Sequence, residues 1–131
     1  MIAIDSSALV SILRNEPDAL LYAEAIGAET SIVMSAVSYL ETSMVLAGPG
    51  FSEAVWPPLD ALLKRANAAV VPFDAEQAAI ARAAFLKYGK GRHPASLNFG
   101  DCASYALARS KRVPLLYKGD DFAKTDIASA L

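Results

Sequence analysis

Four short apolar segments, separated by stretches of helical periodicity, constrain the fold of this chain more than any other feature. The segments are Met1–Ile4, Ser31–Met34, Val70–Val71 and Val113–Tyr117. Each is too short for a helix and is aliphatic, as expected of a buried strand. Strands that alternate with helices of ten or more residues form a parallel sheet covered by helices on both faces. We therefore predict a three-layer α/β/α fold around a mostly parallel sheet of about four to five strands.

The length and composition predict a single domain over residues 1–131. The 54% hydrophobic content is enough for a core and excludes a disordered chain. No apolar run approaches the roughly 18 residues that a membrane span needs. The first residues do not resemble a signal peptide, and the single cysteine, Cys102, cannot form an internal disulfide. We therefore expect a cytoplasmic protein.

The charges are unevenly distributed along the chain. Residues 1–81 carry three basic and ten acidic side chains, whereas residues 82–131 carry nine basic and four acidic ones. The basic part includes a loop rich in glycine, with Lys90, Arg92 and His93. These three side chains are candidates for binding the backbone of a nucleic acid. The alternative is an ordinary loop that faces solvent or a protein partner.

Three of the predicted helices carry the clearest signals. The helix that begins at Ser35 has apolar residues at a period of 3.6, which assigns them to the core: Val37, Leu40, Met44 and Val45. A second helix covers 75–88, with Asp74 as its cap, and a third runs from Asn98 to about Lys111. We also expect the larger aromatic side chains in the core: Trp56, Tyr88, Phe99, Tyr105 and Phe122.

Four acidic residues lie where a site would form in such a fold. Asp5 and Asp120 follow predicted strands, so both would lie at the carboxyl edge of the sheet, although a lone Asp there often only caps a turn. Glu41 is on the helix face assigned to the core, where a charge needs a partner or a cation; alternatively it reaches water at the border of that face. Asp101 is either a helix-capping residue after Asn98 or a site carboxylate.

Taken together, these carboxylates predict a metal site. Acids gathered at one edge with no nearby cation repel one another, and a hard divalent cation such as Mg²⁺ or Mn²⁺ removes that repulsion. Metal sites of this kind serve phosphoryl transfer, because the ion activates water and stabilises the leaving oxygen. Other chemistry has weaker support: Cys102 and His93 lack an orienting partner, and the sequence contains neither a P-loop nor a dinucleotide-binding motif.

Four segments of the chain resemble the VapC-type toxins, which are PIN-domain ribonucleases. The segments are IAIDSSAL (Ile2–Leu9), SAVSYLE (Ser35–Glu41), KYGKGRHPASLNFGDC (Lys87–Cys102) and LLYKGDDF (Leu115–Phe122). The resemblance places Asp5, Glu41, Asp101 and Asp120 in the acidic pocket of the family, and Asp121 is the alternative for the last position. It implies Mg²⁺- or Mn²⁺-dependent cleavage of RNA, a homodimer, and a cognate VapB-type antitoxin as partner.

Two other functions use the same residues differently. A metal-dependent phosphatase acting on a small phosphoester would need the same carboxylates. A non-catalytic binding module would use them only as caps, and its stability would not depend on a metal.

Overall fold

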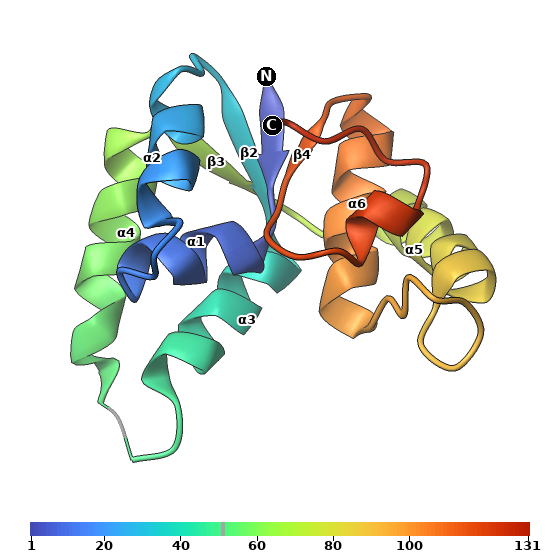
Figure 1. Ribbon diagram of the computed structural model, residues 1–131, viewed down its shortest axis with the longest axis horizontal. Coiled ribbons are helices and arrows are strands. Elements are labelled where there is room, and N and C mark those ends of the chain that lie inside the picture. Colours follow the sequence, from blue (N-terminus) through green and yellow to red (C-terminus); the bar gives the residue numbers. More distant parts are fainter. Residues whose placement is uncertain (51) are drawn as a thin grey trace.

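The computed structural model describes residues 1–50 and 52–131, and its centre is a parallel sheet with the strand order β3-β2-β1-β4 (Figure 1). The strands are β1 (Ile2–Ile4), β2 (Ile32–Ser35), β3 (Ala68–Val71) and β4 (Leu115–Leu116). All three strand pairings are parallel. The predicted α/β class and strand number are confirmed, with strand bounds that differ by a few residues.

In the part of the chain that the structure describes, six α-helices connect or follow the strands. They are α1 (Ser6–Leu13), α2 (Ala19–Gly27), α3 (Ala36–Ala47), α4 (Trp56–Arg65), α5 (Ala75–Tyr88) and α6 (Phe99–Lys111). The described residues also form two single 3₁₀ turns, η1 (Glu53–Val55) and η2 (Phe122–Lys124). None of the described helices is both long and apolar enough to cross a membrane.

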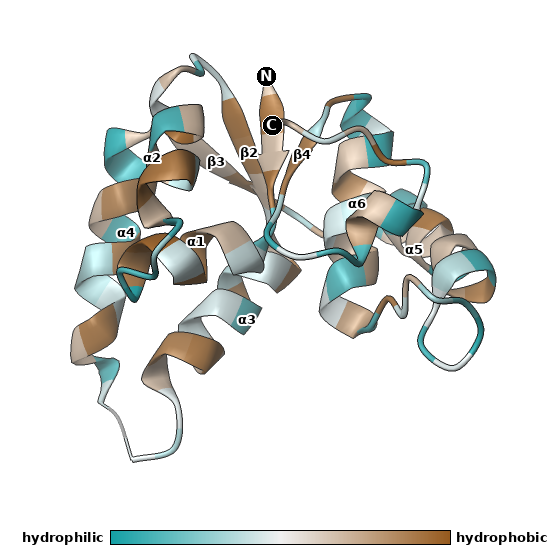
Figure 2. Cartoon of the chain, in the orientation of Figure 1, coloured by the Kyte–Doolittle hydropathy of each residue, from teal (hydrophilic) through white to brown (hydrophobic). Residues whose placement is uncertain are grey.

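The sheet separates two hydrophobic cores, because successive residues of a strand point to opposite faces. Ala3 and Leu115 contribute to the core beneath α5 and α6. Ile2, Ile4 and Leu116 contribute to the core on the other face, with residues of α1, α2 and α4. The strands are hydrophobic along their length and lie between the two helical layers (Figure 2). This three-layer arrangement is the one that the sequence predicts.

Helix α3 faces the core with a different side from the predicted one. Its buried residues are Ser38, Thr42 and Leu46, whereas Leu40 and Met44 are 59% and 64% exposed. Burial of the polar side is possible because its hydroxyls have partners. Ser38 Oγ lies 2.9 Å from Ser104 Oγ, and Thr42 Oγ1 donates to the Ser38 carbonyl. The prediction that the apolar residues of this helix face the core was therefore wrong.

The aromatic residues are divided between core and surface. Tyr88, Tyr105 and Phe122 are buried, as predicted, but Phe99 is 77% exposed at the first position of α6 and Trp56 is also exposed. Phe99 lies beside α3, where it lines a shallow apolar depression together with exposed residues of that helix. The surface next to the start of α6 is consequently apolar.

Candidate metal and phosphodiester site

Asp5 occupies the point where β1 ends and α1 begins, and it is only 2% exposed. Its backbone N–H donates to the Leu116 carbonyl, which fixes it at the carboxyl edge of the sheet. Its Oδ2 accepts hydrogen bonds from Ser7 N at 3.0 Å and Ser7 Oγ at 2.6 Å, and its Oδ1 accepts one from Ser104 Oγ at 2.5 Å. Asp5 is thus both the cap of α1 and a buried carboxylate, held by serines.

A line of buried hydroxyls supports Asp5 from the side of the helices. Ser104 is on α6, three residues after Asp101, and it is hydrogen-bonded to Ser38 on α3. Both serines are fully buried. The line Ser38–Ser104–Asp5 therefore connects α3, α6 and β1 through polar contacts that exclude water.

Asp101 is half-buried in the first turn of α6. Its Oδ2 accepts from the Asn98 N–H while Asn98 Oδ1 accepts from the Asp101 N–H, so the predicted capping role is confirmed. Burial raises the pKa of the Asp101 carboxyl to about 7, and the negative charges of Asp5, Glu41 and Asp121 add to this effect. The capping residue therefore also belongs to the cluster of acids.

Glu41 points from α3 toward the same group. Its Oε1 accepts a hydrogen bond of 2.7 Å from Ser6 Oγ, and its pKa is raised mainly by burial and further by the charge of Asp5. A side-chain carbon on Gly100 would overlap the Glu41 carboxylate. Glycine at position 100 therefore leaves the space that Glu41 occupies. Of the two interpretations of Glu41, the contact with Ser6 and the effect of Asp5 favour the one in which it faces the other acids, although Leu40 and Met44 on the same helix are exposed.

Asp120 and Asp121 lie in the turn that follows β4, and both are exposed. The charge of Asp121 is among those that raise the pKa of Asp101. Of the two candidates for the fourth acid, Asp121 is thus the one whose charge acts on Asp101.

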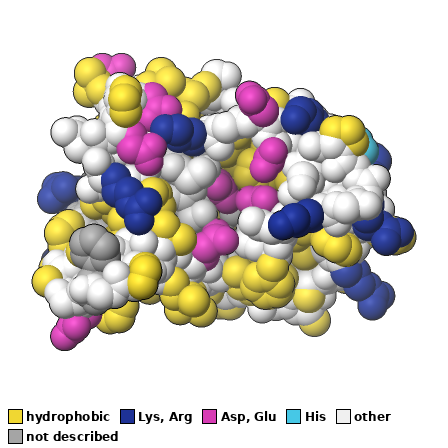
Figure 3. Space-filling model, turned by 60° about the horizontal axis from the view of Figure 1, so that its bottom comes forward, with side chains coloured by type: hydrophobic (Ala, Val, Ile, Leu, Met, Phe, Trp, Pro, Cys, Tyr) yellow, Lys and Arg dark blue, Asp and Glu magenta, His cyan; other side chains and the backbone are white. Residues whose placement is uncertain are grey.

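The acids gather on one face of the molecule, at the carboxyl ends of the strands. Figure 3 shows Asp and Glu side chains in and around a central hollow, with hydrophobic side chains below it and Lys and Arg on either side. None of the ion pairs found in residues 1–50 and 52–131 includes Asp5, Glu41 or Asp101. Within the described part of the chain, their charges are therefore offset by hydroxyls and backbone N–H groups.

These side chains fit a hard cation, because all of them are carboxylates and burial disfavours the charged forms of Glu41 and Asp101. The side chains are nevertheless turned toward serine and backbone donors. Over the described residues, no three His, Cys, Asp or Glu side chains are grouped as a metal site would require. Binding of a cation would therefore require Glu41 and Asp101 to exchange some of their present hydrogen bonds for the ion.

The basic loop between α5 and α6 has its own internal contacts. Arg92 Nε donates to the Leu86 carbonyl, and His93 Nδ1 accepts from the Ala95 N–H. The His93 ring meets the edge of Tyr88 at 5.1 Å between centroids. Lys90 is exposed. Binding of a nucleic acid by this loop stays a prediction.

Comparison with known proteins identifies the family. The PIN domain family matches residues 2–128. The chain is 51% identical over 126 residues to the protein named Ribonuclease VapC of Mycolicibacterium smegmatis, covering 96% of this chain and 97% of that one. The chain is a PIN-domain protein of the VapC type.

Solved structures share the same fold at low sequence identity. The Mycobacterium tuberculosis protein VapC20, described as a toxin that cleaves the sarcin-ricin loop, superposes with a TM-score of 0.78 at 15% identity, over 98% of this chain and 97% of that one. A toxin–antitoxin complex from Klebsiella pneumoniae gives 0.73 at 16% identity, over 100% and 98% of the two chains. These similarities confirm the PIN-type architecture.

Several contributors to this PIN-domain site were not predicted. Ser104 and Ser38 lie far from Asp5 in the sequence, and no local pattern links them to it. The sequence indicates a role for Gly100 only weakly. Glycine in the first turn of a helix destabilises the helix, so its presence there suggests another function for the position. Ser6 directly follows Asp5, but its partner, Glu41, becomes evident only in the fold.

Proposed function

We propose that this PIN-domain protein is a metal-dependent endoribonuclease and the toxin of a toxin–antitoxin pair. The observation that carries the proposal is the meeting of Asp5, Glu41 and Asp101 at the sheet edge without a cationic partner among the described residues. The half-identical relative named as a ribonuclease supports RNA as the substrate.

In this function Asp5 and Asp101 would be the principal ligands of Mg²⁺ or Mn²⁺, with Glu41 and Asp120 or Asp121 completing the pocket. The bound ion would activate water and stabilise the departing 3′ oxygen. The other residues of the protein hold these carboxylates in position. Ser7 and Ser104 hold both oxygens of Asp5, and Gly100 admits the carboxylate of Glu41.

The direct test is cleavage of RNA by the purified chain. We expect total RNA to be cut at discrete positions with Mg²⁺ or Mn²⁺ and to remain intact with EDTA. A generic phosphate monoester should not be hydrolysed. Hydrolysis of the ester without cleavage of RNA would instead support the phosphatase, and inactivity toward both would support the binding module.

Metal binding should stabilise the folded protein, because the carboxylates come together only in the fold. At 100 times its dissociation constant, an ion adds about 2.7 kcal/mol to the free energy of unfolding. Scanning calorimetry should therefore show a higher melting temperature with Mn²⁺ than with EDTA. An unchanged melting temperature would contradict a metal site.

The Gly100→Ala variant should lose cleavage activity while remaining folded. Its new methyl group would occupy the place of the Glu41 carboxylate, which must then move away from the other acids. A displacement of about 1 Å can reduce a rate by about 100-fold. The matched control is Gly27→Ala, since in the described part of the chain no atom beyond its sequence neighbours and its own helix backbone lies within 4 Å of the added carbon. Equal activity of the two variants would exclude a role for Glu41.

Binding of RNA should weaken steeply with salt if Lys90 and Arg92 contact phosphates. In a plot of the logarithm of the RNA-binding constant against the logarithm of the salt concentration, replacing either one with alanine should then reduce the slope by about 0.7 per lost contact. Lys64→Ala is the control, because Lys64 is exposed at the end of α4. Identical slopes in all variants would assign the loop to solvent or to a protein partner.

The exposed apolar residues beside the acids support protein partners for this chain. Leu40, Met44 and Phe99 together form a surface of the kind that marks protein interfaces. We propose a VapB-type antitoxin as one partner, supported by the toxin–antitoxin complex among the fold neighbours. We also propose a homodimer, which light scattering of the isolated chain would detect.

A further inference from the structure

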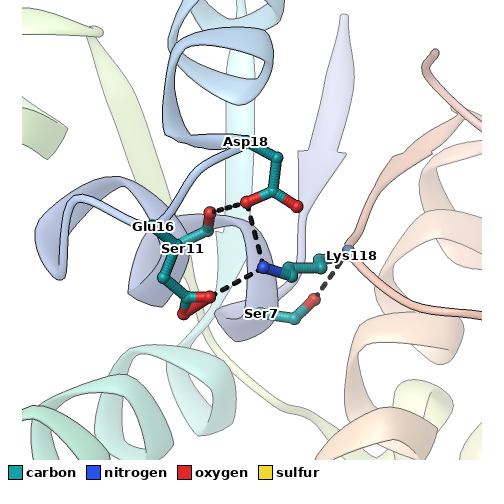
Figure 4. Close-up of polar contacts among 5 residues, drawn as sticks. All are labelled: Ser7, Ser11, Glu16, Asp18 and Lys118. Atoms are coloured by element: carbon teal, nitrogen blue, oxygen red, sulfur yellow. Dashed lines mark hydrogen bonds and ion pairs between the residues drawn. The ribbon is translucent and has the colours of Figure 1, made fainter.

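Lys118 lies at the junction between β4 and the turn that carries Asp120 and Asp121, and it makes three polar contacts (Figure 4). Its backbone N–H donates to Ser7 Oγ at 3.0 Å. Its Nζ is 2.7 Å from Glu16 Oε2 and 2.9 Å from Asp18 Oδ1. These contacts join two parts of the chain that are about a hundred residues apart in the sequence.

The contacts follow one face of α1. Ser7 and Ser11 are four residues apart, so their side chains lie on the same side of the helix, one turn from each other. Ser11 is fully buried and donates to Asp18 Oδ1 at 2.6 Å, which fixes the carboxylate that Lys118 binds. The backbone of Lys118 therefore binds at one end of this face and its ammonium group at the other.

The end at Ser7 is directly connected to the acidic site. A serine hydroxyl has a single proton, and Ser7 gives that proton to Asp5 Oδ2. The lone pairs of the same oxygen are thereby left to accept the Lys118 N–H. The position of the chain at residue 118 and the orientation of the Asp5 carboxylate are thus linked through one hydroxyl group.

The ion pairs contribute more to position than to stability. The side chains of Lys118, Glu16 and Asp18 are each about one-third exposed, and ion pairs that contact solvent stabilise proteins only slightly. A lysine held by two carboxylates is, however, restricted in place. Because Asp120 is only two residues further along, a shift of the backbone at Lys118 would move both candidates for the fourth acid.

We propose that Lys118 is a positioning residue for the acidic site. It fastens the turn after β4 to α1, and it thereby sets the distance between that turn and Asp5. The effect of Lys118 on catalysis rests on the function proposed above. The attachment of the turn to α1 does not depend on that function.

The test compares Lys118→Met, which keeps the length of the side chain but removes its charge, with Lys118→Arg and Lys64→Met. Hydrogen exchange on the metal-free proteins reports the position of the turn. We expect Lys118→Met to speed exchange of the backbone amides at positions 7 and 118 by about tenfold or more, with the centre of α6 unchanged. Lys118→Arg should restore most of the protection, and Lys64→Met should match the wild type.

The second measurement is RNA cleavage as a function of Mn²⁺ concentration. Lys118→Met should need about ten times more Mn²⁺ for half-maximal cleavage and should approach the wild-type rate at saturation, as expected when support of a ligand is lost. Unchanged exchange at positions 7 and 118, or faster exchange throughout the chain, would overturn the proposal, and so would an unchanged Mn²⁺ requirement in an active protein. A wild-type protein that does not cut RNA would refute the proposed function alone, and hydrogen exchange would then decide the role of Lys118.

Discussion

Replacing Asp5 or Asp101 with asparagine should abolish RNA cleavage and leave the metal-free protein at least as stable as the wild type. Each change removes a negative charge from a group of like charges, and two such charges about 4 Å apart repel by roughly 4 kcal/mol at an effective dielectric of 20. Asparagine can keep the existing contacts. At position 101 its oxygen can still accept from the Asn98 N–H, and at position 5 the Ser104 hydroxyl can turn to accept from the new amide.

The control for this experiment is Asp74→Asn. Asp74 caps α5 by accepting from the Gln77 N–H, as a purely structural aspartate does, and it is exposed. We expect this variant to cut RNA like the wild type and to remain toxic when expressed without antitoxin. Comparing Asp120→Asn with Asp121→Asn identifies the fourth acid, and the electrostatic effect on Asp101 favours Asp121. Retained cleavage in both Asp5→Asn and Asp101→Asn would refute the proposed mechanism.

The metal-free protein should lose stability as the pH rises from about 4 to about 7. The pKa of Asp101 is raised from 3.8 to about 7 by folding, so over this range the folded state holds a proton that the unfolded state releases. The contribution is fully present below pH 4 and disappears as the pH passes 7. The shift corresponds to about 4 kcal/mol for a fully desolvated carboxyl, and solvent screening at this half-buried position reduces it to about 2 kcal/mol.

Urea unfolding at several pH values, with EDTA present, measures this dependence. The Asp101→Asn variant should have a flatter profile, because it has no proton to lose at this position. Saturating Mn²⁺ should reverse the trend in the wild type, since the cation favours the deprotonated carboxylates. A wild-type profile that coincides with that of Asp101→Asn would contradict the raised pKa.

The fold was predictable because its signals are local. Short aliphatic strands, the capping residues Asp74 and Asn98, and acids directly after strand ends are all visible in the sequence. The cap at Asn98 also located Asp101 correctly in the first turn of its helix. Positions of this kind depend on hydrogen bonds between residues only a few places apart, so the chain needs no tertiary information to specify them.

The orientation of α3 was not predictable because it depends on distant partners. Periodicity favoured burial of Leu40 and Met44, but the side with Ser38 and Thr42 is the buried one. Ser38 can be buried only because Ser104, 66 residues away, lies opposite it. The contacts of Lys118 were not predictable either, because they also join residues that are far apart in the sequence. Its partners Glu16 and Asp18 are unremarkable acids until β4 is placed next to β1.

The pairing of β1 with β4 also has a consequence for folding during translation. Asp5 is synthesised long before its partners, because its N–H bonds to Leu116 and its carboxylate to Ser104, 99 residues later. Contacts so distant in sequence form slowly and late in folding. The acids therefore stay apart while most of the chain is being translated, and the cell meets an assembled site only after synthesis has passed the last strand.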